Sequence, residues 1–448
     1  MGWVRFAPSP TGLLHVGNAR AALLNALYAR RYGAQFLLRI DDTDRARSDA
    51  AFVEALKADL TWMGLSWERL VFQSERLERY AQAAECLRAT GRLYPCYETP
   101  EELALQRKTL QTQGKPPIYN RRALALSEDE RRALESQGRP AHWRFRLHEN
   151  PVCWNDGIYG KKVFEGAYAS DPVLIRADGV PVYTLASVVD DWELGITQVI
   201  RGADHLANTA VQLQILEALD PKAPSALSWA HYPLFRMRSG EELSKRTGSM
   251  SLQSLREEGI HPLALCSFLA KLGTSEALAP HASLEDLAAG FALSNMSLAE
   301  AQFDPDDLRR LNRHLWPILP VASVASDIPP SDFPFSADFW KAIRGNIETL
   351  QDVGYWQRVC YGLLPPGADE EPAFREACLL CTQRAPEAIG EVSAWQAFVQ
   401  DLSQKTGRKG RALFHPLRLL LTGRDTGPEL WVLVALMGRE RMLQRLAR

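Results

Sequence analysis

Long apolar runs are missing from this chain of 448 residues, and so is any strong excess of charge. No apolar stretch reaches the roughly 18 residues of a membrane-spanning helix, which excludes that class of membrane protein. The start of the chain has no basic segment followed by an apolar one, so we expect no secretory signal. The formal net charge of −2 provides no general attraction to nucleic acid. A composition of 46% hydrophobic and 24% charged residues is typical of a globular protein, here with two to four domains.

Cysteine is also scarce, and the seven that occur are scattered along the chain. An odd number without regular spacing does not fit a disulfide framework and suits free thiols in a reducing cytoplasm. Only Cys378 and Cys381 lie close together, with neither a second pair nor a histidine nearby. We interpret them as packed helix residues rather than as a metal or redox site.

The first forty residues predict a strand, a helix and a second strand. Residues 3–7 fit a short strand, and two prolines and a glycine break it within 8–12. Residues 19–32 carry leucines at helical spacing, and 35–40 fit the next strand. Such a βαβ unit predicts a parallel sheet.

This pattern is interrupted between about 80 and 180. Strand-like pieces such as 142–147 follow polar and helical stretches there, which predicts an α+β insertion. The parallel-sheet pattern resumes with strands predicted at 182–189 and 196–200, and beyond about 210 the chain is expected to be mainly helical.

Charge is uneven near the C-terminus. Residues 401–448 contain ten Lys or Arg and four Asp or Glu, whereas residues 301–400 contain eight and fourteen. The basic end fits contacts with phosphates, and a solvated helix face explains it equally well.

The segment from Arg5 to Asn18 carries the strongest functional signal. It reads Arg-Phe-Ala-Pro-Ser-Pro-Thr-Gly-Leu-Leu-His-Val-Gly-Asn, a strand that breaks into a turn and then into a helix beginning near His15 and Gly17. A helix N-terminus presents free N–H groups and the positive end of the helix dipole, so it favours phosphate groups. His-x-Gly alone would favour a structural turn, but the preceding Pro-Ser-Pro-Thr-Gly makes this a candidate nucleotide site.

A second segment, Leu243-Ser244-Lys245-Arg246, predicts a polar, flexible loop with a lysine about 220 residues later. Together the two segments resemble the HIGH and KMSKS motifs of class I aminoacyl-tRNA synthetases. The form of the first resembles the glutamyl branch of that family. The resemblance implies that ATP activates L-glutamate and that the glutamyl group is then transferred to the 3′ end of a tRNA. The acceptor would be tRNA(Glu), tRNA(Gln) or both.

The resemblance also implies site residues. His15 and Lys245 would be catalytic, because they would stabilise charge on the phosphates while the substrate carboxylate attacks in line. The implied ATP-binding residues are Pro8, Gly12, His15, Gly17, Asn18, Asp204, Ser244 and Lys245. The implied glutamate-binding residues are Arg5, Ala7, Ser9, Asp41, Tyr183, Ser187 and Arg201. The implied KMSKS-like loop consists of Glu242, Leu243, Ser244, Lys245 and Arg246.

Two arginines match the two carboxylates of glutamate, because a guanidinium can bind a carboxylate through two parallel hydrogen bonds. Arg5, Arg201 and Tyr183 are predicted at strand ends, where open α/β sheets bind ligands. The alternative is that both arginines form ion pairs on the surface.

Three positions depart from the family's motifs. Asn18 replaces a histidine, Asp41 replaces a glutamate that would face the substrate ammonium, and Glu242 replaces a lysine. Asparagine can still bind ribose or phosphate, aspartate keeps the charge but is shorter, and the lost lysine removes a cation near the phosphates. The last two changes leave a weakly catalytic tRNA-binding regulator as an alternative. Another alternative is an adenylate-forming ligase that does not use tRNA.

The implied fold is an α/β Rossmann-type parallel-sheet catalytic domain with an α+β acceptor-binding insertion, followed by all-α stem-contact and anticodon-binding domains. The expected ranges are 1–80 and 182–209 for the catalytic domain, 81–181 for the insertion, 210–318 for the stem-contact domain with the KMSKS-like loop, and 319–448 for the anticodon-binding domain. Asn346 aligns with an arginine that reads the last anticodon base in discriminating members. We therefore expect tolerance of, or preference for, tRNA(Gln), with an amidotransferase acting downstream.

The implied cofactors are ATP and Mg²⁺. Relatives often hold zinc in the insertion through several cysteines with a histidine or tyrosine. Only Cys96 remains of such a set, so we predict no structural zinc. A cytoplasmic monomer without a membrane partner is expected.

Overall fold

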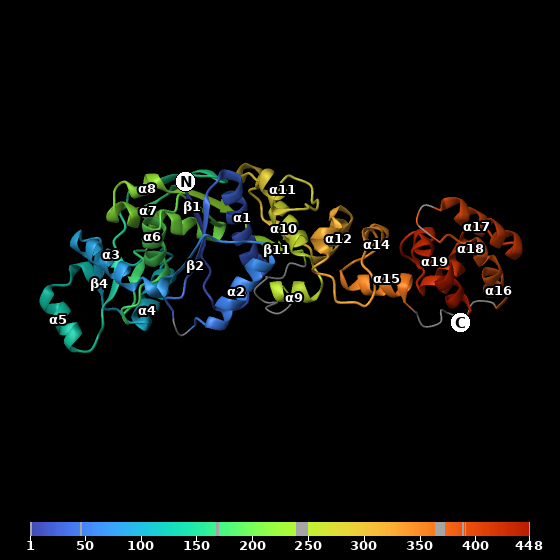
Figure 1. The fold of residues 1–448 in the computed structure, drawn as a ribbon. Coiled ribbons are helices and arrows are strands. Elements are labelled where there is room, and N and C mark those ends of the chain that lie inside the picture. The colour runs from blue at the N-terminus through green and yellow to red at the C-terminus, as the bar shows by residue number, and fades with distance from the viewer. Residues whose placement is uncertain are drawn as a thin grey trace. The chain divides into compact units, whose positions relative to one another are not determined.

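The computed structural model describes residues 2–44, 47–166, 170–238, 250–362, 372–387, 389 and 391–447. It divides into two compact units (Figure 1). The first consists of Met1–Leu255, Cys266–Leu278 and Ser283–Asp304, and the second of Arg256–Leu265, Ala279–Ala282 and Pro305–Arg448. This division is coarser than the four predicted domains, whose boundaries stay predictions.

The N-terminal βαβ unit is confirmed. Strands β1 (Trp3–Phe6), β2 (Gln35–Ile40) and β3 (Arg69–Phe72) form a parallel sheet in that order. Helices α1 (Val16–Tyr32) and α2 (Ala50–Trp62) connect them. The leucines of α1 are buried, and the helix ends at Gly33, whose left-handed backbone returns the chain toward β2. This crossover places the turn after β1 and the start of α1 at the carboxyl edge of the sheet, where open α/β folds bind ligands.

A second sheet has the strand order β7-β6-β10-β9. Strands β9 (Gln198–Gly202) and β10 (Ser228–Tyr232) are parallel, and helix α7 (Leu206–Leu219) connects them. Strand β6 (Val152–Asp156), which forms a hairpin with β7 (Gly160–Phe164), pairs with β10. Strand β10 was not predicted, so the expectation of a mainly helical chain beyond about 210 begins too early.

The strand predicted at 182–189 is wrong, because these residues begin helix α6 (Tyr183–Glu193). Leu185, Ala186, Val188 and Val189 are all buried there, so the apolar run faces the core on every side. A segment that is buried on all sides shows no hydrophobic periodicity, so its sequence fits a buried helix as well as a buried strand. Tyr183 therefore lies in the first turn of a helix and not at a strand end.

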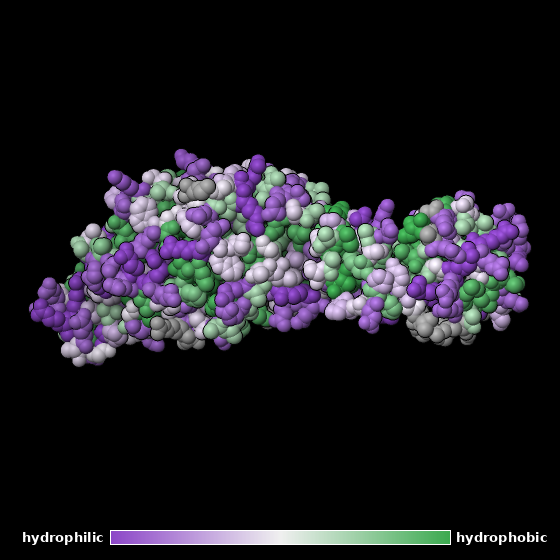
Figure 2. All heavy atoms as spheres, viewed as in Figure 1, coloured by the Kyte–Doolittle hydropathy of each residue, from purple (hydrophilic) through white to green (hydrophobic). Residues whose placement is uncertain are grey.

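The predicted α+β insertion consists of short helices around an antiparallel sheet with the order β4-β5-β8. Its elements are α3 (Leu77–Ala89), β4 (Leu93–Cys96), α4 (Pro100–Thr112), α5 (Glu128–Ser136), β5 (His142–Phe145) and β8 (Val173–Ile175). In the view of Figure 2, hydrophilic side chains gather over α5, none of whose residues is buried.

The rest of the first unit and the start of the second contain short elements. These are α8 (Ala223–Ala226), β11 (Phe235–Met237), α9 (Leu252–Glu257), α10 (Pro262–Lys271), α11 (Leu284–Ala289) and β12 (Ala301–Phe303). From residue 305 onward, the elements of the described chain are all helical. They are α12 (Pro305–Leu315), α13 (Val321–Val324), α14 (Ala337–Ile343), α15 (Gln351–Tyr361), α16 (Pro372–Cys381), α17 (Val392–Thr406), α18 (Arg411–Thr422) and α19 (Leu430–Leu446), with short 3-10 turns between them.

The helical part has its own core, in which Trp316, Trp340 and Trp356 are almost fully buried. Cys378 and Cys381 are buried in the same core, as expected for packed helix residues. Among the described helices, none is long and apolar enough to cross a membrane.

Candidate active site

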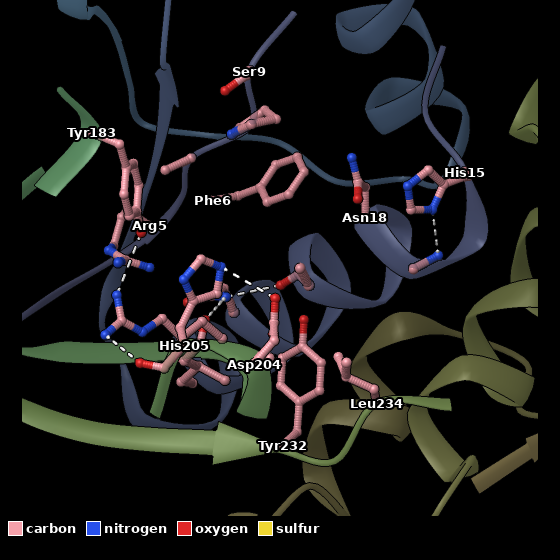
Figure 3. A pocket seen from close by; sticks show the side chains of 18 of the residues that line it. Arg5, Phe6, Ser9, His15, Asn18, Tyr183, Asp204, His205, Tyr232 and Leu234 are labelled. Carbon is pink, nitrogen blue, oxygen red and sulfur yellow. Dashed lines mark hydrogen bonds and ion pairs between the residues drawn. The ribbon is translucent and has the colours of Figure 1, made fainter. Parts of the chain in front are cut away.

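A cavity of about 520 Å³ opens at the carboxyl ends of β1 and β9, beside the start of α1. Its lining brings together many of the predicted site residues. They are Arg5, Ala7, Pro8, Ser9, His15, Gly17, Asn18, Tyr183, Arg201 and Asp204. Figure 3 shows Arg5 and Tyr183 on one side of the cavity and His15 and Asn18 on the other. The cavity therefore has two chemically different ends.

Other predicted residues lie elsewhere. Gly12 is in the turn before α1 but does not line the cavity, and Ser187 is fully buried behind it. Asp41 lines an adjoining cavity, which shares Ser9 and Tyr183 with the first. The predicted loop of Glu242, Leu243, Ser244, Lys245 and Arg246 lies outside the described residues.

At the end of the cavity beside the start of α1, His15 caps this helix. Its Nδ1 accepts a hydrogen bond from the backbone N–H of Gly17 over 3.1 Å. A Cβ at residue 17 would lie 3.0 Å from the His15 ring, so glycine lets the ring cap the helix at close range. Partial desolvation lowers the pKa of His15, which keeps the ring neutral near pH 7. With Nδ1 accepting, the neutral ring carries its proton on Nε2, and that N–H is a donor for an incoming oxygen.

Residues 250–252 contact the chain at this same end. The backbone N–H of Val16 donates to the carbonyl of Met250 over 3.3 Å, and that of Leu252 donates to the carbonyl of Leu14 over 3.0 Å. Met250 and Leu252 therefore lie beside the start of α1.

The opposite end of the cavity is built on buried charge. Arg5 donates from Nε and Nη2 to the two carboxylate oxygens of Asp191, over 3.0 and 3.1 Å. Arg39 donates to the same carboxylate over 2.9 Å. All three side chains are buried, so the interpretation of Arg5 as a surface ion pair is wrong. Asp191 was not among the predicted site residues, although the Asp-Asp doublet after an apolar run was a signal for it.

Arg201 is also buried, with 6% of its surface exposed, so the interpretation of Arg201 as part of a surface ion pair is wrong as well. Its Nη2 donates to Thr209 Oγ1 and Gln212 Oε1, both over 2.7 Å, and Nη1 donates weakly to the Tyr183 hydroxyl over 3.4 Å. Burial lowers the pKa of the guanidinium. Among the described residues, no carboxylate forms an ion pair with it. A buried cation with this environment favours an incoming anion.

Asp41 is held by Arg39 instead of facing the main cavity. Arg39 donates from Nε and Nη2 to the two oxygens of Asp41, over 2.7 and 3.1 Å. Burial raises the pKa of Asp41 to about 6; Arg39 opposes the shift, and the nearby Asp190 and Asp191 add to it. The carboxylate is therefore charged at neutral pH and loses its charge in mild acid.

Gly202 marks a close approach at the end of β9. A Cβ at this residue would lie 2.4 Å from Oδ1 of Asp204 and 3.0 Å from Leu234. Glycine thereby allows Asp204 to turn back over the strand end and reach the cavity lining, where Figure 3 shows it beside His205.

A separate buried cluster lies in the insertion. The possible ligand atoms of Cys96, Glu98 and His142 lie within 4.8 Å of one another, although the sequence had suggested Cys96 alone. Tyr119 and Arg122 donate to Oε1 of Glu98 over 2.7 and 2.9 Å. Burial raises the pKa of the Cys96 thiol to about 12. Oε2 of Glu98 and Nε2 of His142 are buried without a hydrogen-bond partner among the described residues. The cluster nevertheless offers one thiol and three possible ligands, which is a poor fit to the four ligands of a typical structural zinc site.

Comparison with known proteins accounts for this arrangement. Residues 3–310 match the family described as tRNA synthetases class I (E and Q), catalytic domain. The chain belongs to this family. Residues 339–448 of the synthetase match a second family, the anticodon binding domain. The predicted enzyme class, a class I aminoacyl-tRNA synthetase with ligase activity, is confirmed.

Relatives resemble the synthetase over nearly its full length. It is 49% identical over 446 residues to glutamate–tRNA ligase 2 of Methylorubrum populi, covering 99% of this chain and 98% of the relative. Identity to the glutamate–tRNA ligase of Azospirillum brasilense is 48%, with the same coverage. A crystal structure of a glutamate tRNA ligase from Elizabethkingia meningosepticum, in complex with its amino acid, aligns with a TM-score of 0.80 at 26% identity, covering 100% of this chain and 98% of that one. The predicted fold class is confirmed, and the alternatives of a tRNA-independent ligase or a binding regulator are not favoured.

Proposed function

We propose that the synthetase activates L-glutamate with ATP and transfers the glutamyl group to the 3′ end of tRNA. The observation that carries this proposal is the two-ended cavity, which sets two buried guanidinium groups opposite a helix N-terminus. Guanidinium groups fit the carboxylates of glutamate, and the helix N-terminus fits the phosphates of ATP. The relatives that cover almost the whole chain carry the name glutamate–tRNA ligase.

Glutamate would bind between Arg5 and Arg201. Arg5 uses Nε and Nη2 on Asp191, so both N–H groups of its Nη1 remain for a ligand. Arg201 has one further N–H on Nη1 beyond its contact with Tyr183. Each guanidinium would take one substrate carboxylate, and Asp41 would face the ammonium from the adjoining cavity. Ser187 would act at a distance, since its hydroxyl accepts a hydrogen bond from Gln212.

ATP would bind at the other end, against Pro8, Gly12, Gly17, Asn18 and Asp204. The substrate carboxylate would attack the α-phosphate in line, and pyrophosphate would leave. The Nε2–H of His15 would donate to a phosphate oxygen, and Lys245 would add a cation from the KMSKS-like loop. Mg²⁺ bound with ATP would neutralise further charge on the phosphates.

The choice of tRNA would depend in part on Asn346. This residue is exposed in the turn between α14 and α15, within the part that matches the anticodon binding domain. Without an arginine at this position, we propose that the synthetase accepts tRNA(Gln), alone or beside tRNA(Glu). An amidotransferase would then convert the mischarged product.

Transfer of labelled glutamate to separate tRNA(Glu) and tRNA(Gln) transcripts tests both levels of the proposal. Charging of tRNA(Gln) supports the role of Asn346, and an Asn346→Arg variant should then shift the preference toward tRNA(Glu). Charging of tRNA(Glu) alone would reject the proposal about Asn346 and leave the activity intact. Charging of neither transcript would reject the activity itself.

Three further points complete the proposed function. We propose a monomer that acts in the cytoplasm, where its seven cysteines remain the free thiols that the structure describes. We also propose that it holds no structural zinc, because the cluster of Cys96, Glu98 and His142 offers one thiol and three possible ligands, whereas a structural zinc site typically has four, mostly cysteines and histidines. Metal analysis of the purified protein tests this last point, and one zinc per chain would reject it.

A further inference from the structure

Behind the cavity, a buried chain of three side chains ends on Arg201. Nε of Arg201 lies 3.1 Å from Nε2 of His231, and Nδ1 of His231 lies 2.5 Å from Oδ2 of Asp156. His231 is completely buried, and Asp156 is 2% exposed. Neither His231 nor Asp156 lines the cavity, so these two side chains can affect a ligand only through the guanidinium of Arg201.

The direction of these hydrogen bonds is fixed by chemistry. An arginine Nε is always a donor, so Nε2 of His231 must accept. A neutral imidazole that accepts at Nε2 carries its proton on Nδ1, and that proton is donated to Asp156. Burial lowers the pKa of His231, which agrees with a neutral ring. Asp156 thus stabilises the tautomer of His231 whose Nε2 can accept a hydrogen bond from Arg201.

Asp156 is itself held firmly. Its Oδ1 accepts hydrogen bonds from the backbone N–H groups of Ile158 and Tyr159 over 3.0 Å, and of His231 over 3.2 Å. These donors leave Oδ2 as the oxygen that faces the ring. The carboxylate sits at the end of β6, which lies within the predicted insertion range of 81–181 but pairs with β10. The insertion hairpin therefore reaches the substrate arginine through His231.

We propose that Asp156 and His231 are positioning residues that set the direction of the Arg201 guanidinium toward a carboxylate of glutamate. This inference rests on the proposed role of Arg201 in binding glutamate. With Nε fixed by His231 and Nη2 fixed by Thr209 and Gln212, the guanidinium plane cannot turn, and only Nη1 is left for the ligand.

An Asp156→Asn variant tests the proposal at full length. The three backbone donors would hold the amide oxygen, so the amide N–H₂ would face Nδ1 of His231 and move the ring proton to Nε2. Two donors would then oppose each other at Arg201. We expect the KM for glutamate to rise about 10- to 100-fold, as small displacements of positioning groups do, with the KM for ATP within about twofold of wild type. A His231→Asn variant, whose shorter amide does not reach Nε of Arg201, should behave alike.

The conservative His231→Gln variant supplies the rescue. Its amide can turn its oxygen toward Arg201, so we expect a KM for glutamate within about fivefold of wild type. In that background Asp156→Asn should add little, because the amide has no tautomer to select. Asp171→Asn is the matched control: Asp171 is an equally buried carboxylate of the insertion that binds Arg121 and the backbone of Leu147. It should leave the KM for glutamate unchanged.

The outcomes separate this proposal from the proposed function. If Arg201→Lys leaves the KM for glutamate unchanged, the role of Arg201 fails, and the positioning proposal fails with it. If Arg201→Lys raises this KM but Asp156→Asn and His231→Asn do not, only the positioning proposal is overturned. The same holds if Asp156→Asn has an equal effect with histidine and with glutamine at 231, because the effect would then be general. Thermal unfolding of each variant shows that folded protein is compared.

Discussion

The two ends of the active-site cavity are built in opposite ways. At the end with Arg5 and Arg201, the ligand-facing groups are buried and tied to several partners. At the end with His15, this residue is exposed at the start of a helix, and its Nδ1 accepts a hydrogen bond from the backbone N–H of Gly17. The first end is a preformed receptor. At the second end, the N–H groups of Val16 and Gly17 already have acceptors, and the Nε2–H of His15 is left as a donor for a ligand.

This difference follows from the ligands that each end would take. A buried cation needs partners that offset its desolvation, so the arginines require a surrounding network. Phosphates are attracted to a helix N-terminus by the helix dipole and by the N–H groups that remain there, and such a site needs no buried side chain. The comparison teaches that a substitution at the first end should change stability and substrate affinity together. At the second end it should change the rate with little loss of stability.

The strongest test removes the charge beneath the first end. Asp191→Asn would leave Arg5 and Arg39 buried without the carboxylate that they share, and breaking a buried ion pair costs about 3–5 kcal/mol. We expect the free energy of unfolding of the first transition in urea to fall by that amount. Asp178→Asn, which removes an exposed carboxylate paired with Arg176, should change it by less than about 0.5 kcal/mol. A loss below about 1 kcal/mol for Asp191→Asn would break the comparison.

His15→Ala tests the second end. Loss of a donor to the phosphates should lower kcat for adenylate formation by about 10²–10³, measured by pyrophosphate exchange in the presence of tRNA. The lost helix cap should cost only about 1 kcal/mol of stability. His15→Asn separates the two roles, since asparagine caps a helix well but lacks the Nε2–H. Its stability should match wild type while its kcat stays low, and a near-normal kcat would contradict the assignment.

Acidification distinguishes the two ends in the unmodified protein. Asp41 has its pKa raised to about 6, so it gains a proton and loses its charge as the pH falls through that value. The KM for glutamate should rise between pH 7 and pH 5, while the KM for ATP follows only the titration of ATP itself. Asp41→Asn is the control, because it should show the acid-limb KM at every pH. An equal pH dependence in wild type and variant would exclude Asp41 as the cause.

The smallest expected effect is that of Tyr183→Phe, which tests one hydrogen bond at the first end. Tyr183→Phe removes only the weak hydrogen bond of 3.4 Å to Nη1 of Arg201, beside the tilted contact between the rings of Tyr183 and His205. We expect the KM for glutamate to rise about two- to fivefold, equivalent to one modest hydrogen bond. Steady-state kinetics with glutamate varied at saturating ATP measures it. A rise beyond about 50-fold would mean that Tyr183 binds the substrate directly.

The sequence predicted what depends on neighbours along the chain. The βαβ unit and the helix start at His15 are short segments with their own turn and capping residues, so the sequence predicted them directly. Helix α6 was misread, because its residues are buried on all sides and show no period.

The parts of the site that the sequence did not predict depend on contacts between residues far apart along the chain. Asp191 meets Arg5 across 186 positions, and His231 meets Asp156 across 75. Local patterns contain no information on such pairs, and charged residues are ordinarily expected at the surface. A buried carboxylate therefore becomes visible only when its partner is known.

The pairing of β6 with β10 makes the insertion less separable than its separate sheet suggests. A chimera that exchanged residues 81–181 for the equivalent segment of a relative would also exchange the carboxylate at the end of β6, which holds His231. Exchange of either part alone would therefore preserve the hydrogen bond to His231 only where the donor supplies an acid at that strand end.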